Sequence, residues 1–90
     1  MNKLESLRGQ IDKIDKQLIT LFEKRMDISQ EIGEYKGNNG LSIWDADREK
    51  QVIEKNIGNI QEKYQKYMEE FITCIMKISK DIQKTEIEER

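Results

Sequence analysis

The sequence contains no histidine, no proline and only one cysteine, Cys74. The lack of histidine excludes zinc-finger, metalloprotease and histidine-based triad sites, so we expect no metal centre. A single cysteine cannot form an intrachain disulfide. Because Cys74 lies inside the apolar run of residues 71–76, we expect it to be a buried packing residue.

Long apolar runs are also missing, because none approaches the ~20 residues that a membrane span requires. No N-terminal stretch combines a basic start, an apolar run and a small-residue cleavage site, so we expect no signal peptide. These features predict a cytoplasmic protein that does not enter a membrane. The formal net charge of −2 shows no basic bias, which argues against nucleic acid as a partner.

Apolar residues are scarce as well, making up 36% of the 90 residues, whereas charged residues make up 38%. The length predicts one domain, residues 1–90. A chain of this size and composition is marginally stable alone. Since disulfides and metals are excluded, we expect a second copy of the chain to supply the missing core.

The lack of proline and the abundance of Glu, Lys, Gln, Ile and Leu favour helix throughout, so we predict an all-α fold. A first, very long helix is expected from about residue 3 to about residue 36, roughly 50 Å in length. No 90-residue globule can enclose such a helix, so it either bends or is packed along its length by another copy. Its apolar residues recur at steps of three and four, as one stripe requires: Leu4, Leu7, Ile11, Ile14, Leu18, Leu21, Ile28, Ile32 and Tyr35.

Two shorter helices are predicted after the turn-forming residues 37–40. The second helix begins with either Ser42 or Asp45 as its N-cap, and Asn59 is expected to cap the third. Ser79 and Gln83 lie one turn apart on the flank of the third helix's apolar stripe. That stripe comprises Tyr64, Met68, Phe71, Ile75, Ile78 and Ile82.

Arg25 interrupts the first stripe at a position that calls for an apolar residue. Either its stem packs while its head reaches water, or its guanidinium is buried and needs an anion, because an unpaired buried charge is costly. The anion could be a ligand or one of three carboxylates: Glu23, Asp27 or Glu49.

Lys36 lies on the same face as Arg25, about 16 Å further along the helix. It could complement the helix dipole at the C-terminus, or it could hold a small dianion together with Arg25. Arg48, Glu49, Ser79 and Gln83 add polar groups where three helices could converge. A cationic cluster with polar donors and no histidine suits the binding of a small polyanion.

These residues carry a resemblance to the small all-helical class of chorismate mutase. The matching segments are Leu7-Arg8 with Ile11-Asp12, residues 21–25 and 32–36, the Asp-x-x-Arg-Glu pattern of residues 45–49 and the Ser-x-x-x-Gln pattern of residues 79–83. The resemblance covers about residues 4 to 84. It implies the cofactor-independent rearrangement of chorismate to prephenate, a step in phenylalanine and tyrosine biosynthesis. The site residues that it implies are Arg8, Arg25, Lys36, Asp45, Arg48, Glu49, Ser79 and Gln83.

The resemblance also implies roles for these residues. The cations hold the two carboxylates of the substrate, and Ser79 lines the same pocket. Glu49, with the backbone near Asp45, holds the ring hydroxyl. Lys36 and Gln83 flank the ether oxygen whose bond to carbon breaks, and with Arg25 they are the catalytic residues that we expect.

Arg8 and Lys36 are separated by about 42 Å along one straight helix, so they cannot both touch one small ligand. If Arg8 belongs to the site, it comes from a second chain, and we predict an intertwined antiparallel homodimer with two shared sites. Two alternatives remain open, an isochorismate-pyruvate lyase of the same fold and a non-catalytic helical dimerisation module.

Overall fold

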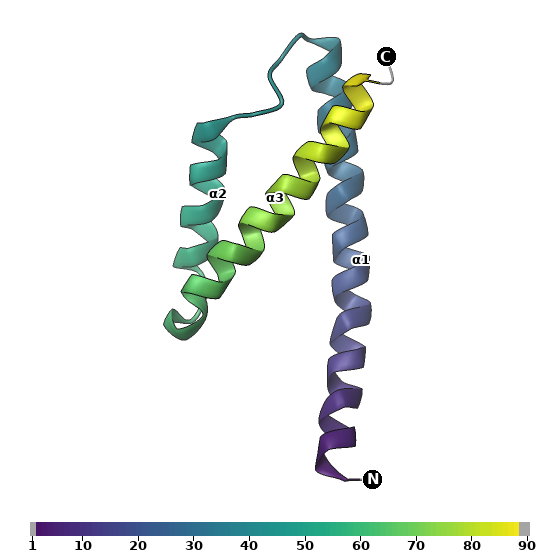
Figure 1. Ribbon diagram of the computed structural model, residues 1–90, viewed down its shortest axis with the longest axis vertical. Coiled ribbons are helices and arrows are strands. Elements are labelled where there is room, and N and C mark those ends of the chain that lie inside the picture. Colours follow the sequence, from purple (N-terminus) through teal and green to yellow (C-terminus); the bar gives the residue numbers. More distant parts are fainter. Residues whose placement is uncertain (1, 89–90) are drawn as a thin grey trace.

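The computed structural model describes residues 2–88 and contains helices but no strands in that range (Figure 1). The helix α1 spans Lys3–Asn38, α2 spans Ala46–Gly58 and α3 spans Gln65–Glu88, with a short 3-10 helix, η1, at Glu62–Tyr64. The prediction of an all-α chain with one very long helix and two shorter ones is confirmed.

Local sequence explains where α1 begins and ends. The side chain of Asn2 accepts a hydrogen bond of 2.8 Å from the backbone N–H of Glu5, which caps the first turn. The helix continues past Gly37 and ends at Asn38, two residues later than predicted, with Asn39 as its C-cap. Gly40 follows with a φ of 63°, a left-handed conformation that glycine adopts without steric cost and that turns the chain away from the helix.

The connection between α2 and α3 differs from the sequence prediction. Asn59 is the C-cap of α2 and donates from its side-chain amide to the carbonyl of Lys55 at 2.8 Å. It therefore does not cap α3, which begins after the 3-10 turn that follows Gln61. The prediction for Asn59 was wrong because asparagine is common at both ends of helices, and here it caps the C-terminal end of α2.

The three helices form a thin layer, with overall extents of 56 × 28 × 14 Å. The helix α3 crosses α1 near the C-terminal end of α1 and packs against α2 at its own N-terminal end, whereas α1 and α2 do not pack against each other (Figure 1). The N-terminal half of α1 extends well beyond the other two helices. None of the helices described is both long and apolar enough to cross a lipid bilayer.

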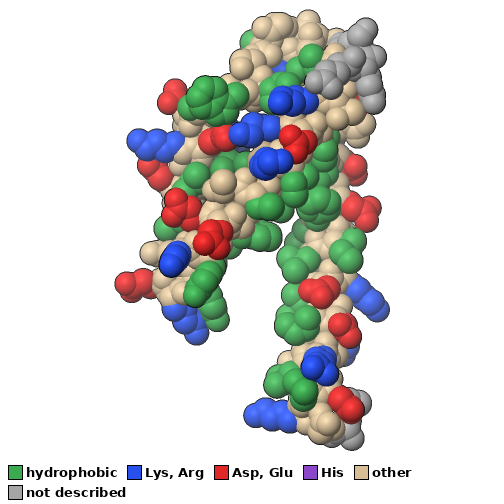
Figure 2. Space-filling view, in the orientation of Figure 1, with side chains coloured by type: hydrophobic (Ala, Val, Ile, Leu, Met, Phe, Trp, Pro, Cys, Tyr) green, Lys and Arg blue, Asp and Glu red, His purple; other side chains and the backbone are tan. Residues whose placement is uncertain are grey.

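Few hydrophobic side chains are buried within this layer. Among residues 2–88 the buried hydrophobic side chains are Met26 and Met76. Figure 2 shows a row of hydrophobic side chains on the side of α1 that faces the other helices. Large apolar side chains that stay exposed along α1 include Leu4, Leu7, Ile11, Ile14, Leu18 and Leu21.

The most deeply buried positions of α3 lie on the flank of its apolar stripe. Ser79 and Gln83, expected on the flank, are both buried at 7% exposure, whereas Phe71 of the stripe is exposed. Cys74 is exposed too, so the prediction of a buried cysteine was wrong. Its side chain points about 200° around the helix from buried Met76, two residues later.

Gly33 sets how closely α1 and α3 approach. It is buried in α1, and a Cβ added to it would lie 2.8 Å from the Cα of Gln83 and 3.1 Å from its carbonyl oxygen. Those neighbours are backbone atoms and cannot move aside as a flexible side chain could. Only glycine therefore permits the two helices to touch at this point.

We expect Gly33→Ala to lower the free energy of unfolding by about 1–3 kcal/mol, because the methyl group separates α1 from α3. Gly58→Ala is the matched control, since nothing lies within 4 Å of the added Cβ. That variant should be unchanged or more stable by up to about 1 kcal/mol, as alanine is the better helix former. Urea unfolding measures both, and an equal response of the two variants would contradict the contact.

Candidate active site

A cavity of about 380 Å³ lies among the C-terminal half of α1, the connection to α2, the first turns of α2 and the C-terminal half of α3. Its size falls within the roughly 300–1,000 Å³ of small-molecule pockets. It gathers residues from segments far apart in the sequence. Seven of the eight residues predicted for the site line it: Arg25, Lys36, Asp45, Arg48, Glu49, Ser79 and Gln83.

Arg8 is the exception. It is exposed on the N-terminal half of α1 and does not line this cavity. The distance from Arg8 to Arg25 along the helix is about 26 Å. Its assignment to the site of a second chain stays a prediction.

Arg25 and two serines form the buried corner of the cavity. The Nη1 atom of Arg25 donates to the hydroxyl of Ser79 at 3.0 Å, and this hydroxyl is also hydrogen-bonded to that of Ser29. Both serines are buried. The sequence analysis missed Ser29, although it follows Arg25 by one helical turn on the same face and is a small polar residue beside an apolar stripe.

The guanidinium of Arg25 has no carboxylate partner among the described residues. Of the three carboxylates considered for it, Glu49 pairs with Lys80, and no ion pair joins Arg25 to Glu23 or Asp27. Burial, and to a lesser degree the positive charge of Arg48, lower the pKa of Arg25. Arg25 is therefore a partly desolvated cation whose protein partner is a neutral hydroxyl, as an anion-binding group would be.

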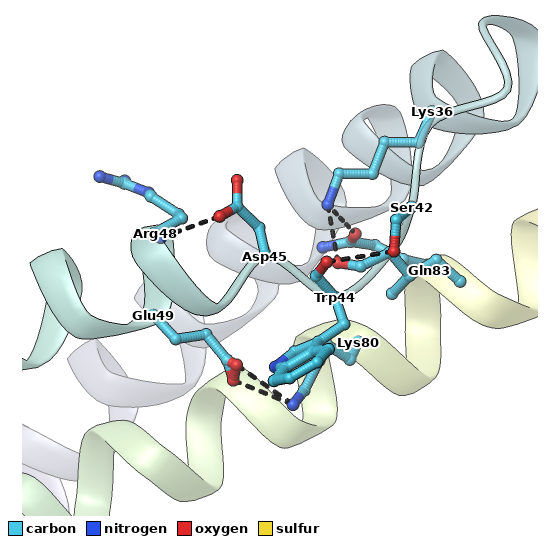
Figure 3. A network of polar contacts seen from close by, with 9 residues as sticks. Lys36, Ser42, Trp44, Asp45, Arg48, Glu49, Lys80 and Gln83 are labelled. Carbon is cyan, nitrogen blue, oxygen red and sulfur yellow. Dashed lines mark hydrogen bonds and ion pairs between the residues drawn. The ribbon is translucent and has the colours of Figure 1, made fainter.

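Lys36 joins three elements at the other end of the cavity (Figure 3). From the last turns of α1 its Nζ donates to the carbonyl of Ile43 at 2.9 Å and to Oε1 of Gln83 at 3.1 Å. Since an ammonium has three N–H groups, one remains for a ligand. The amide oxygen of Gln83 is used as an acceptor, which leaves its NH₂ group to donate to a ligand.

The first turn of α2 supplies the next group of polar side chains. Asp45 is the N-cap of α2 and accepts from the backbone N–H of Arg48 at 3.0 Å, so it is Asp45 and not Ser42 that starts the helix. Ser42 instead donates to the carbonyl of Trp44 at 3.1 Å. With its carboxylate used as a cap, Asp45 fixes the start of the helix from which Arg48 and Glu49 project, and both of these residues line the cavity (Figure 3).

Glu49 pairs with a residue of α3 that the sequence analysis did not assign to the site. The Nζ atom of Lys80 donates to Oε1 of Glu49 at 3.0 Å and contacts Oε2 at 3.4 Å. The one feature of the sequence that pointed to Lys80 was its position directly after Ser79, which was predicted to belong to the site. The cavity is thus lined by four cations and two carboxylates: Arg25, Lys36, Arg48 and Lys80, with Asp45 and Glu49.

This excess of positive charge, together with N–H and O–H donors, suits a small molecule with two negative charges. Within residues 2–88 no cluster of three or more acidic or cysteine side chains could hold a metal ion. Neither a nucleophile activated by a base nor a histidine lies in the cavity. Fold and cavity together define an all-α protein equipped to bind a small polyanion and to stabilise charge on it.

Comparison with known sequences specifies that class. The sequence model of the family described as chorismate mutase type II matches residues 7–84. The chain therefore belongs to the chorismate mutase type II family. This agrees with the resemblance carried by the Asp-x-x-Arg-Glu and Ser-x-x-x-Gln patterns.

Named relatives include longer proteins. The T-protein of Haemophilus influenzae is 41% identical over 49 residues, which are 54% of this chain and 13% of that protein. The bifunctional chorismate mutase/prephenate dehydratase of Aquifex aeolicus is 36% identical over 55 residues, 61% of this chain and 15% of that protein. The chorismate mutase of Methanocaldococcus jannaschii is 31% identical over 55 residues, which cover 56% of its length. Each alignment thus covers less than two thirds of the relative.

A solved structure is similar over nearly the whole chain. It is a conserved hypothetical protein from Pyrococcus furiosus, with a TM-score of 0.76 and 36% sequence identity, and the match covers 92% of this chain and 97% of that one. The long helix and the two shorter ones therefore recur together in a related protein.

The environment of Arg25 leads to a stability prediction. Arg25→Met should leave the free energy of unfolding unchanged or raise it by up to about 1 kcal/mol, because it removes a partly desolvated cation that lacks a carboxylate partner. The same variant should no longer be stabilised against heat by a dicarboxylate ligand. Lys24→Met, which removes an exposed cation of the same turn, should retain that stabilisation. A loss of more than about 2 kcal/mol in Arg25→Met would show that Arg25 is a structural residue.

Proposed function

We propose that this chain is a chorismate mutase, which rearranges chorismate to prephenate. The observation that carries the proposal is the convergence of seven predicted residues, from three helices and the N-cap of α2, on one cationic cavity. Membership of the chorismate mutase type II family supports the same activity.

The chemistry asks little of the protein beyond positioning and charge. In one intramolecular step the C–O bond of the ether breaks and a C–C bond forms, with no proton transfer and no covalent enzyme intermediate. The substrate must first adopt its compact diaxial conformer, which a pocket can select by holding both carboxylates. Arg25 and Arg48 are the cations that we assign to the carboxylates, with Ser79 beside Arg25.

Stabilisation of the transition state is assigned to Lys36 and Gln83. As the C–O bond lengthens, negative charge grows on the ether oxygen, and fixed donors lower the energy of that charge without having to reorient. Lys36 is fixed by its bonds to Ile43 and Gln83. Its remaining N–H and the amide NH₂ of Gln83 can therefore converge on one oxygen.

The proposal includes a second copy of the chain as partner. A layer only 14 Å thick leaves the apolar row of α1 exposed. An antiparallel copy would cover that row and would bring its own Arg8 towards the cavity. The support for this arrangement is the exposed apolar surface together with the length of α1, because a monomer cannot bury either.

The biological setting follows from the reaction. Prephenate leads to phenylalanine and tyrosine, and one relative carries a name that couples chorismate mutase to prephenate dehydratase. We therefore assign the chain to aromatic amino-acid biosynthesis. Its cytoplasmic location stays a prediction.

An assay with product identification tests the activity. Incubation with chorismate should produce prephenate at a rate proportional to enzyme concentration, and Lys36→Ala should lower kcat by at least about a hundredfold, because it removes a donor to the developing oxyanion. Release of pyruvate, from chorismate or from isochorismate, would support the lyase instead. The absence of turnover with both compounds would leave a non-catalytic helical module.

A mixing experiment tests the shared site. Arg8→Ala and Lys36→Ala should each be inactive alone, and after subunit exchange they should recover about one quarter of the wild-type activity. Half of the dimers are then mixed, and each has one intact site of two. The matched control combines Arg25→Ala with Lys36→Ala, where both residues serve the site on their own side, and should recover nothing. No recovery in the first mixture, with mixed dimers detected by mass spectrometry, would overturn the shared-site arrangement.

A further inference from the structure

Lys80 is the charged side chain of the cavity that has no role in the proposed reaction. It extends from α3 towards the first turn of α2, where its Nζ lies 3.0 Å from Oε1 and 3.4 Å from Oε2 of Glu49 (Figure 3). Both side chains line the cavity. The pair therefore connects two helices at the wall where a ligand would lie.

A second lysine on the same helix shows what an ordinary surface pair looks like. Lys77 pairs with Asp81 at 3.1 Å one turn away along α3, and their side chains are 73% and 57% exposed. The side chains of Lys80 and Glu49 are 32% and 25% exposed, and 31 residues separate them in the chain. The Lys80–Glu49 pair is better shielded from water than the Lys77–Asp81 pair, so its attraction is less weakened by solvent and salt.

The contact with Lys80 restricts Glu49 without saturating it. A glutamate side chain has three rotatable bonds, and a carboxylate facing an open cavity would otherwise adopt several orientations. Lys80 makes one contact with each carboxylate oxygen, and a carboxylate offers about four acceptor positions in all. The remaining acceptor positions are left for a hydroxyl donor within the cavity.

Charge gives Lys80 a second effect. Glu49 is an anion in a cavity that the proposed function fills with a dianion, and two like charges at close range repel each other. The ammonium of Lys80 lies against Glu49 and offsets that repulsion. Both effects act through Glu49 and require no contact between Lys80 and the ligand.

We propose that Lys80 is a positioning residue that holds the Glu49 carboxylate in the orientation that accepts a hydrogen bond from the ring hydroxyl of the substrate. This inference rests on the proposed function and assigns to that site a residue beyond the eight predicted from the sequence. It makes recognition of the hydroxyl depend on the packing of α2 against α3.

The test compares steady-state kinetics of the wild-type chain with Lys80→Met, Lys80→Arg and, as matched control, Lys77→Met. Lys80→Met should lower kcat/KM for chorismate about tenfold, chiefly through KM, because a loosely held carboxylate weakens binding of the substrate and of the transition state alike. Lys80→Arg should restore kcat/KM to within about threefold of wild type, since it keeps a donor opposite Glu49. Lys77→Met should have no effect.

A double-mutant cycle separates action through Glu49 from a direct or merely structural role. In a Glu49→Gln background, Lys80→Met should change kcat/KM by less than about twofold, because the carboxylate that Lys80 orients is gone. A tenfold loss that persists in this background overturns the proposal. Circular dichroism of every variant checks the helical fold. If a single substitution fails to fold, the double variant still serves, because it removes both charges and leaves no unpaired ion.

A chorismate analogue without the ring hydroxyl provides a readout that a general loss of stability would not move. Wild type and Lys80→Met should differ less with this analogue than with chorismate, and equal losses with both compounds overturn the inference. The same series distinguishes its failure from failure of the proposed function. A wild-type chain that does not turn over chorismate refutes the mutase itself, whereas an active wild type with an unaffected Lys80→Met refutes only the role of Lys80.

Discussion

The close approach of α1 and α3 at Gly33 is the constraint on which the rest of the structure depends. Because the backbone of Gln83 lies where a side chain at position 33 would be, the residues one turn away on either helix meet as well. Ser29 then reaches Ser79, and Lys36 reaches the amide of Gln83. Because Gly33 has no side chain, α1 and α3 come close enough to form hydrogen bonds at both ends of the cavity.

Within the described residues, the protein does not neutralise all of the positive charge in the cavity. Arg25 has a hydroxyl for a partner and Lys36 has two uncharged oxygens, whereas the carboxylates of Asp45 and Glu49 are used as a helix cap and as the partner of Lys80. Among the described residues, Arg25 and Lys36 therefore have no ion-pair partner. A dianion bound here, as proposed, would supply the missing negative charge and so stabilise the folded chain.

The sequence predicted the helices because they depend on local chemistry, and the resemblance carried by its spaced polar residues named seven of the residues that line the cavity. The stripe and the missing proline determine α1, and the misplaced charge of Arg25 identifies the cavity. The apolar stripe of α3 did not show that its flank is the part that is most deeply buried, because the close approach of α1 and α3 is set by Gly33. That is why Ser79 and Gln83 were expected on a flank, Cys74 in a core and Lys80 nowhere in the site.

The thinness of the layer affects how the folded state of the chain depends on protein concentration. With only Met26 and Met76 buried as hydrophobic side chains among the described residues, folding gains little from contacts within one copy. If a second copy covers the apolar row of α1, then folding, association and completion of the cavity become a single equilibrium. Dilution would then unfold the chain and dismantle its site together, so that the activity of each molecule would depend on how many others the cell makes.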